Sequence, residues 1–352
     1  MNLYYNRRRS ARHGQHFSAD QIKQGEHLRA LSPQSWHRFK ELTQNACIPL
    51  SLGHPTRVSV LPYGENAREY ASLPLPDHIQ AAAREISRRE NQKLIAKGVR
   101  EGWIDDEKLA VRSIRVQDSF YKDNNVVSIR ASTMRWSEIL AMKDFPFEKI
   151  AELSAFKLDT NTHLIARDGA HYVLLVAARG KKPGDVRMGD ESLLAPSAGE
   201  KQLTLAVNGT IDRKTMGDGP HNESTGEAVR YMSIWAELEE EHGLVSYAQS
   251  RNTTAGSYGH LGLMLDAIKF VGAVGIVNEV ITEFSPAEIE IARQTAKDKS
   301  EIGPLEIVPM EMASVARYLV LNRDNMLPQL ITGLVLLGYK HWGDVFLRLS
   351  EK

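Results

Sequence analysis

The sequence predicts an α/β protein, an α+β sandwich in which a mixed β-sheet lies between helices, with an additional mainly helical N-terminal region. Three observations support this prediction. From about Leu109 onward, short β-branched segments alternate in hydrophobicity with a period of two, amphipathic stretches separate these segments, and before Leu109 the apolar residues recur at helical spacing. Strands interleaved with helices in this way are typical of a sheet with helices on both faces.

The composition is that of an ordinary globular protein. The chain has 352 residues, 42% of them hydrophobic and 25% charged, which is enough for one large or two medium domains. Lysine plus arginine and aspartate plus glutamate each number 44, so no overall field attracts nucleic acid or an anionic membrane, and we expect neither as a partner. Cys47 is the only cysteine, which excludes an intrachain disulfide and suits a reducing compartment, so we expect a cytoplasmic protein.

The segment Met1–Gly14 contains several arginines but lacks the apolar core of a secretory signal, and we expect it to be flexible. The longest apolar run, Leu327–Tyr339, is far below the ~20 residues of a membrane span, so we expect a buried terminal helix there. We divide the chain into five ranges: a flexible basic arm (1–16), a mainly helical region (17–109), connecting strands and a helix (110–159), a sheet domain (160–320) and C-terminal helices packed on it (321–352).

The N-terminal region has three predicted helices. Ser18 can cap a helix over Ala19–Leu31, and Ser32 can cap a second that begins with Pro33, because hydroxyl caps and a first-turn proline favour helix starts. Asp77–Lys97 has apolar residues at helical spacing. Its basic residues alternate with glutamates, and we interpret them as a solvated face.

The later elements follow from periodicity and turn residues. The predicted strands are Val111–Val116, Val126–Ala131, Thr162–Ala166, Tyr172–Ala177, Leu203–Val207 and Phe270–Val280. Asp168-Gly169 predicts a tight hairpin between two of them. The predicted helices are Trp136–Met142, Gly226–His242, Pro286–Ala296, Glu311–Leu319 and Leu327–Leu347.

One of these helices presents a row of carboxylates. Its apolar residues fall on one side, while Glu237, Glu240 and Glu241 fall on the opposite, solvent-exposed side at spacing i, i+3 and i+4. Ser224 is placed to cap the start of this helix and Gly243 to end it in the left-handed conformation. Exposed like charges at this spacing repel one another unless a cation neutralises them. Spacing alone leaves two interpretations open, a plain polar face and a cation site.

The residues around these glutamates resemble the Nudix hydrolase superfamily. Glu237–Leu244 matches the second half of the Nudix box, which reads Glu, hydrophobe, any, Glu, Glu, any, Gly, hydrophobe. A hairpin over Leu164–Ala178 that ends at Arg179, a strand and glycine turn over Leu205–Gly209 and a later strand over Phe270–Glu279 stand in the family's order. The resemblance extends over about 160 residues and implies a Nudix-like domain within 160–320.

The resemblance implies a chemistry as well as a fold. In the family, the box carboxylates bind Mg²⁺ or Mn²⁺, hard ions that prefer oxygen ligands and that clamp a diphosphate. Carried over to this chain, it implies Glu237, Glu240 and Glu241 as metal-binding and catalytic residues, and a phosphate-binding group made of Arg179, Lys181 and Lys182. A downstream carboxylate often joins the metal site, and here either Glu279 or Glu283 could serve.

This sequence departs from the family pattern at three places. Asn222, Ala228 and Ala236 stand where the box has glycine, glutamate and arginine. We therefore carry two hypotheses forward. The first is a metal-dependent pyrophosphohydrolase of nucleoside diphosphate derivatives; the second is a non-catalytic Nudix-fold nucleotide sensor or protein-interaction module. In both, the ligand is a nucleotide-type small molecule, and we expect the N-terminal region to shape specificity or homo-oligomer contacts.

The remaining motifs indicate no competing site. Ala255–Gly262 is rich in glycine but lacks the spacing of a dinucleotide fingerprint and the lysine of a P-loop, so we expect a flexible loop near the carboxylates. The twelve histidines include no paired zinc-binding spacing. Ser257 and His260 lack the context of a catalytic triad.

Overall fold

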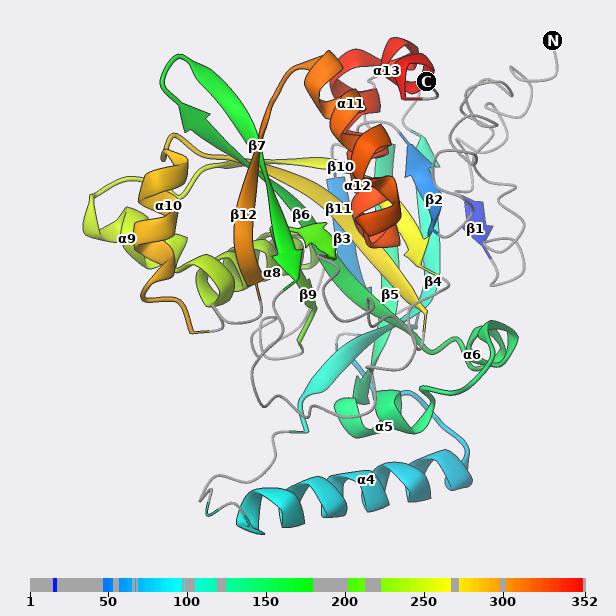
Figure 1. Cartoon of the computed structure of the whole chain (residues 1–352). Coiled ribbons are helices and arrows are strands. Elements are labelled where there is room, and N and C mark those ends of the chain that lie inside the picture. Colours follow the sequence, from blue (N-terminus) through cyan, green and yellow to red (C-terminus); the bar gives the residue numbers. More distant parts are fainter. Residues whose placement is uncertain are drawn as a thin grey trace, which may run out of the picture.

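The computed structural model describes a large mixed sheet flanked by helices (Figure 1). The described residues are 15–17, 47–52, 57–64, 67, 69–96, 98, 105–118, 125–179, 202–212, 223–266, 272–297 and 302–350. The helices expected over Ala19–Leu31 and from Pro33, most of the basic arm, Lys181 and Lys182, and the side chain of Arg179 lie outside the described part.

The described strands form one 12-stranded sheet, which confirms the predicted α/β class. Its strands are β1 (Gln15–Phe17), β2 (Cys47–Leu52), β3 (Arg57–Pro62), β4 (Glu107–Asp118), β5 (Asn125–Arg135), β6 (Phe156–Asp168), β7 (His171–Arg179), β8 (Leu203–Leu205), β9 (Val207–Thr210), β10 (Ser257–Asp266), β11 (Ala273–Ile281) and β12 (Ile302–Pro309). Two pairings, β6 with β11 and β3 with β5, are parallel and the others are antiparallel, so the sheet is mixed.

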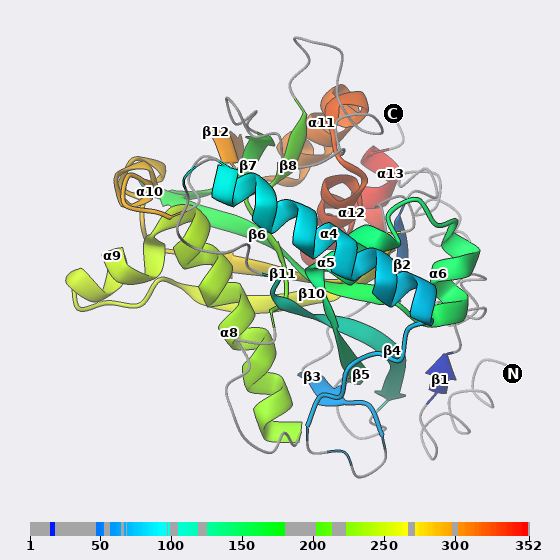
Figure 2. The same ribbon diagram turned by 90° about the horizontal axis from the view of Figure 1, so that it is seen from below.

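The described helices lie on both faces of this sheet (Figure 2). They are α4 (Asp77–Ala96), α5 (Trp136–Ala141), α6 (Phe147–Leu153), α8 (Glu223–His242), α9 (Leu244–Ser250), α10 (Pro286–Arg293), α11 (Met312–Asn322), α12 (Pro328–Trp342) and α13 (Asp344–Leu349), with a 3₁₀ turn at Arg323–Asn325. One core cluster joins the sheet to α8, α9 and α10, and another joins it to α11, α12 and α13. Among the described residues, no helix has the length and apolar character needed to cross a membrane.

Strand β6 organises the part of the sheet that carries the candidate site. It pairs with β11 along one edge, and with β7, β9 and β4 along successive stretches of the other. Because side chains alternate along a strand, Leu164 and Ala166 face α8 whereas His163 and Ile165 face α12. Residues on the two faces of β6 therefore enter different environments.

Most of the predicted strands and helices are confirmed within a few residues. The Asp168-Gly169 hairpin joins β6 to β7, with Gly169 at φ 61°. Helix α8 begins at Glu223 and therefore includes Ser224, which we expected to cap it. The long C-terminal helix is interrupted at Gly343, where a φ of 61° ends α12 and α13 begins.

Several elements correct the sequence predictions. Ala255–Gly262 is not a flexible loop, because strand β10 begins at Ser257 and the residues of β10 pair with β11 and β2. Strands β2 and β3 fall in the range expected to be mainly helical and join the sheet. The strand β12 and the helices α6 and α9 have no counterpart among the predicted elements. Their short, irregular apolar patterns contain too few residues to reveal a period.

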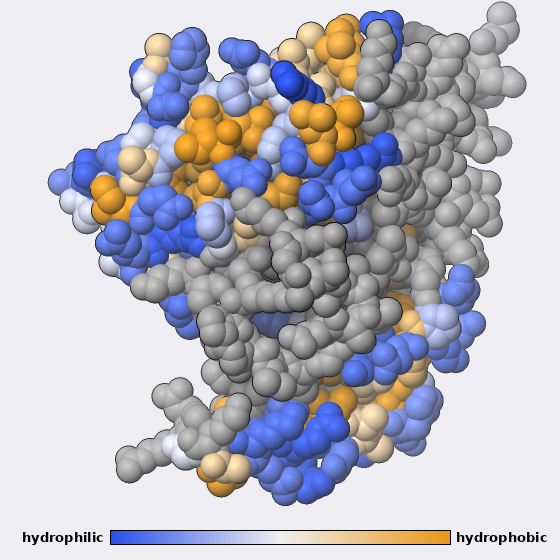
Figure 3. Space-filling model, viewed as in Figure 1, coloured by the Kyte–Doolittle hydropathy of each residue, from blue (hydrophilic) through white to orange (hydrophobic). Residues whose placement is uncertain are grey.

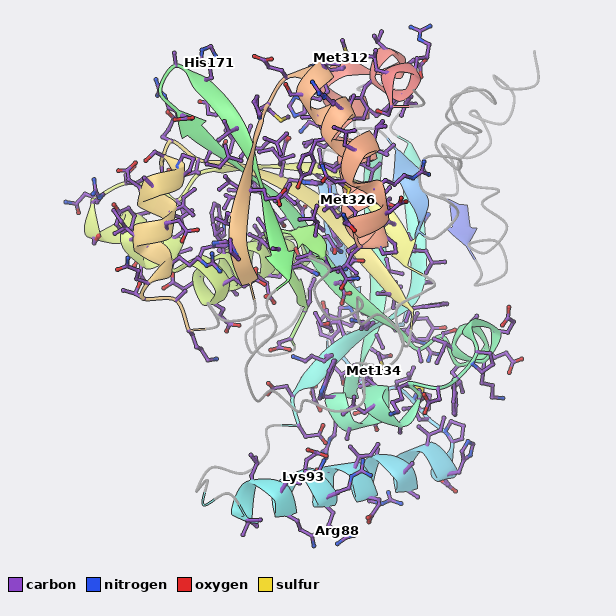
Figure 4. All side chains as sticks on the ribbon, in the orientation of Figure 1. Arg88, Lys93, Met134, His171, Met312 and Met326 are labelled. Carbon is purple, nitrogen blue, oxygen red and sulfur yellow. The ribbon has the colours of Figure 1, made fainter. Side chains whose placement is uncertain are left out.

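Helix α4 occurs close to its expected bounds and packs mainly on α5 (Figures 1 and 2). Its outward surface is hydrophilic in the space-filling view (Figure 3), and Arg88 points away from the rest of the molecule (Figure 4). Arg88 pairs with Glu85 at 2.6 Å, and Lys93 pairs with Glu90 at 2.8 Å, all on the same helix. These pairs support the interpretation of this surface as a solvated face rather than a phosphate-binding patch.

Candidate functional site

The carboxylate row lies at the C-terminal end of α8. Ile234 and Leu238 are fully buried against the sheet, and Gly243 ends the helix with a φ of 61° and an N–H that donates to the Glu239 carbonyl at 2.8 Å. The helix is therefore held on its apolar side, as periodicity predicted. The glutamates project from the sides of α8 that do not carry Ile234 and Leu238.

The three glutamates differ in exposure, so the expectation that all three are solvent-exposed is wrong. Glu240 is exposed, and its carboxylate lies 3.9 Å from the Lys297 ammonium. Glu237 is half-buried, and Glu241 is only 6% exposed. The reason is the neighbouring strand β9, which covers the side of the helix that carries Glu237 and Glu241.

Both inward glutamates contact β9 directly. The Glu241 carboxylate accepts a hydrogen bond from the Asn208 N–H at 3.2 Å. The Glu237 carboxylate lies against Gly209, where an added Cβ would come within 1.9 Å of Glu237 Oε1. Only glycine leaves room for this placement. The Leu205–Gly209 segment therefore lies beside the carboxylate helix.

The environment of Glu237 holds its carboxyl in the protonated form. Burial and, after it, the charges of Glu240, Asp212 and Asp159 together raise the pKa of Glu237 to about 8, although Lys108 acts in the opposite direction. A neutral carboxyl is favoured because the charged form would be poorly solvated and repelled by its neighbours. Glu237 and Glu240 stand three positions apart on α8, a spacing that places two side chains on neighbouring turns of a helix.

Further charged residues gather at the end of β9, and sequence reasoning did not identify them. Lys108 of β4 pairs with Asp212, just after β9. On β6, Lys157 pairs with Asp159 at 3.2 Å, and Thr210 donates to Asp159 at 2.8 Å. Lys157 and Asp159 are two apart on a strand that we expected to begin only at Thr162. Two polar residues at alternating positions before an apolar run were the feature of the sequence that could have indicated an earlier start of this strand.

The two downstream carboxylates lie in other contacts. Glu279 points toward α12, where it bonds to Lys340 and, at 2.8 Å, to His341 Nε2. Glu283 is exposed and bonds to Arg167 at 2.5 Å and to Tyr172 at 2.7 Å. Neither contact involves α8, so the expectation that one of them completes the carboxylate site has no support in the described geometry.

The described carboxylates can be compared with the ligand requirements of a divalent ion. Among the described side chains, no three from histidine, cysteine, aspartate and glutamate are grouped to hold a metal ion. Mg²⁺ commonly needs only one or two carboxylates, because water and substrate phosphates fill its remaining positions. Glu237 and Glu240 are hard oxygen donors on successive turns of one helix and meet this smaller requirement. Glu241 accepts a hydrogen bond from the Asn208 amide through one of its two carboxylate oxygens.

Comparisons with known proteins give weak similarities. No protein-family model and no curated protein matches the chain. Tm1382, a Nudix hydrolase candidate of known structure, aligns with 59% of this chain and 79% of its own at 12% identity and a TM-score of 0.32. The Nudix hydrolase from Alicyclobacillus acidocaldarius aligns with 52% of this chain and 90% of its own, at 12% identity and a TM-score of 0.32. The Nudix domain of Shewanella oneidensis NrtR, complexed with ADP ribose, aligns with 44% of this chain and 74% of its own, at 11% identity and a TM-score of 0.22. TM-scores this low assign no family, and the α/β class stands on the sheet and helices described above.

Proposed function

We propose that this protein is a metal-dependent pyrophosphohydrolase of nucleoside diphosphate derivatives, with its site between the C-terminal half of α8 and β9. The observation that carries this proposal is the placement of Glu237 and Glu240 three positions apart at the C-terminal end of α8, with the Glu237 carboxylate against Gly209 of β9. Like charges at this spacing on one helix repel one another. A cluster that repels itself in this way has a favourable interaction to offer a cation. The resemblance of Glu237–Leu244 to the Nudix box supplies the reaction class.

Mg²⁺ or Mn²⁺, held by Glu237 and Glu240, would neutralise charge on the diphosphate and activate water. Glu237 must lose its proton to take part as a ligand or as a base, and its pKa of about 8 sets the cost of that step in the metal-free protein. Gly209 lets the backbone of β9 approach this carboxylate closely. These residues therefore position charge at one edge of the sheet.

Phosphate contacts are assigned by the resemblance alone, to Arg179, Lys181 and Lys182. Strands β7 and β9 pair with successive stretches of the same edge of β6, and the later residues of β7, up to Ala178, pair with β8. Guanidinium and ammonium groups would bind the charged oxygens of a diphosphate. The nucleoside and the leaving group stay open within this proposal.

A second function, nucleotide sensing without hydrolysis, is favoured by two observations. Ala236 stands where the family box has arginine, so the carboxylates lack a family partner on the helix. The Lys297 ammonium lies 3.9 Å from Glu240 and already provides positive charge there. In this case the protein would bind a nucleotide and leave it intact.

The deciding experiment measures phosphate and nucleotide release from a panel of nucleoside diphosphate derivatives, with and without Mg²⁺ or Mn²⁺. We expect metal-dependent turnover in the wild type and a loss of at least about 100-fold in Glu240→Gln, because charge stabilisation at phosphorus is removed. Glu290→Gln on α10 is the matched control, since that glutamate pairs with Arg293 of its own helix. Turnover that survives Glu240→Gln contradicts the proposed chemistry, whereas tight nucleotide binding with no turnover supports the sensor.

A further inference from the structure

Two consecutive residues at the end of α8 bind the backbone on either side of Val207. The Glu241 carboxylate accepts from the Asn208 N–H at 3.2 Å, and the ring Nε2 of His242 lies 2.7 Å from the Ala206 carbonyl oxygen. Ala206 joins β8 to β9, so both contacts fall where the chain passes from one strand to the other. The end of the helix is thereby attached to that junction at two points.

Burial separates Glu241 from the other two glutamates. The side chain is 6% exposed, His242 beside it is fully buried, and Glu240 one position earlier is exposed. A charged oxygen removed from water requires hydrogen bonds in compensation, and the Asn208 amide supplies one. Glu240, by contrast, is exposed and accessible to a hydrated divalent ion.

The contact also determines where Glu237 lies. Glu237 and Glu241 are four residues apart and project from the same side of α8, one turn from each other. Anchoring Glu241 to Asn208 N sets the separation between this side of the helix and β9. That separation is small at Gly209, where the Glu237 carboxylate occupies the space that a Cβ would need.

We infer that Glu241 is a positioning residue that holds β9 against α8 and so places Glu237, and that it is not a metal ligand in this chain. This inference rests on the proposed function for the role of Glu237 and Glu240. It departs from what the resemblance to the Nudix box implies, where the equivalent glutamate binds the ion. His242 shares the positioning role from the adjacent position.

The test compares two substitutions that separate charge from hydrogen bonding. Glutamine retains an oxygen that can accept from Asn208 N–H but loses the charge that a metal ligand needs, whereas alanine loses both. For each of Glu241→Gln, Glu241→Ala and Glu240→Gln in the full-length protein, Mn²⁺ affinity is measured by calorimetry. Amide hydrogen exchange of the β8–β9 segment is followed by mass spectrometry.

We expect Glu241→Gln to retain both Mn²⁺ affinity and slow exchange at Asn208. Glu241→Ala should speed that exchange roughly tenfold, since a hydrogen bond to a charged group is lost, and weaken Mn²⁺ binding about tenfold, as outer partners of metal ligands do. Glu240→Gln should lose Mn²⁺ with exchange unchanged. Loss of Mn²⁺ in Glu241→Gln with normal exchange would identify a ligand and overturn the inference.

The exchange measurement keeps this inference distinct from the proposed function. If the wild type binds no Mn²⁺, the proposed metal chemistry fails, while faster exchange in Glu241→Ala but not in Glu241→Gln still supports the positioning role. Wild-type exchange in both variants overturns that role whatever the metal result. If Glu241→Ala does not fold, Glu241→Gln decides alone, because a ligand and a hydrogen-bond acceptor give opposite results for Mn²⁺.

Discussion

Two glutamates that are partly or fully removed from water, on opposite faces of the sheet, have pKa values shifted in opposite directions. Glu237, between α8 and β9, has a raised pKa because burial and neighbouring carboxylates oppose its charge. Glu279, under α12, is also buried, yet its pKa is lowered, since the bonds from His341 and Lys340 outweigh the cost of burial. Burial alone therefore does not determine the charge of a carboxylate; its partners do.

Glu279 belongs to a structural ion pair, whereas Glu237 has the like-charged surroundings expected of the proposed cation site. Glu279 already has its positive partners, and they attach α12 to β11. Glu237 has the like charges of Glu240, Asp212 and Asp159 near it, whereas Lys108 acts in the opposite direction on its pKa. A perturbed carboxylate of the second kind is the better indication of function, because nothing in the fold requires the repulsion.

The largest stability effect is expected from Glu279→Gln. The change leaves the Lys340 ammonium, which is 22% exposed, without its carboxylate, and we expect a loss of about 3 kcal/mol in the free energy of unfolding. Urea denaturation measures it. Glu283→Gln, which removes an exposed carboxylate just after β11, is the control and should change little. Equal effects for both substitutions would show that the buried ion pair of Glu279 stabilises the fold no more than an exposed one.

A smaller loss is expected from Gly333→Ala on α12. An added Cβ would lie 2.6 Å from the ring Nε2 of buried His163, which cannot move aside, so we expect a net cost of about 1–3 kcal/mol despite the better helix propensity of alanine. Gly209→Ala on the other face meets only the mobile end of Glu237. It should cost less stability in urea but reduce Mn²⁺ affinity, and a stability loss as large as that of Gly333→Ala would contradict this.

The pH dependence of stability provides a further test of the raised pKa that distinguishes Glu237 from Glu279. A folded-state pKa of about 8, above the unfolded value of 4.5, means that the folded protein keeps a proton that the unfolded chain releases. The stabilisation that this retained proton gives the folded state is fully present below pH 4.5. It is lost as the pH rises toward 8, and the free energy of unfolding falls by up to about 1.4 kcal/mol per pH unit. Glu237→Gln should therefore be more stable than the wild type at pH 8 by about 1–3 kcal/mol, with the gap closing at pH 5.

That pH series needs a control for the charge change. Glu290→Gln removes one carboxylate from α10 without touching β9, and its stability should follow the wild-type curve from pH 5 to pH 8. Thermal unfolding across this range gives the comparison. If Glu237→Gln shows the same slope as the wild type, Glu237 is not protonated in the folded protein.

The smallest effect is expected from Lys297→Ala. Its ammonium is 77% exposed and 3.9 Å from Glu240, so stability should change by less than about 0.5 kcal/mol. Because the lysine competes with a cation for the same carboxylate, Mn²⁺ affinity should rise by about twofold, which corresponds to roughly 0.4 kcal/mol. Calorimetry checks this, and weaker Mn²⁺ binding in the variant would show that Lys297 assists the site.

The α/β class and the carboxylate helix could be predicted because they depend on local pattern. Period-two segments such as Val111–Val116 identify strands, and the apolar side of α8 with Gly243 at its end identifies the helix and the side on which its glutamates lie. These signals arise from steric and hydrophobic requirements that neighbouring residues impose on one another. The sequence by itself therefore determined the class, the helix and the row of glutamates.

The exposure and partners of those glutamates were decided only by tertiary structure. Glu241 turns inward because Asn208, thirty-three positions earlier, presents an N–H to it. Glu237 is half-buried because Gly209 lets β9 approach. Asp159 joins them from β6, whereas Glu279 is directed to the opposite face by its place on β11. Periodicity gives the direction of a side chain from its own element. Which distant segment meets it, and hence its charge, depends on how the elements pack.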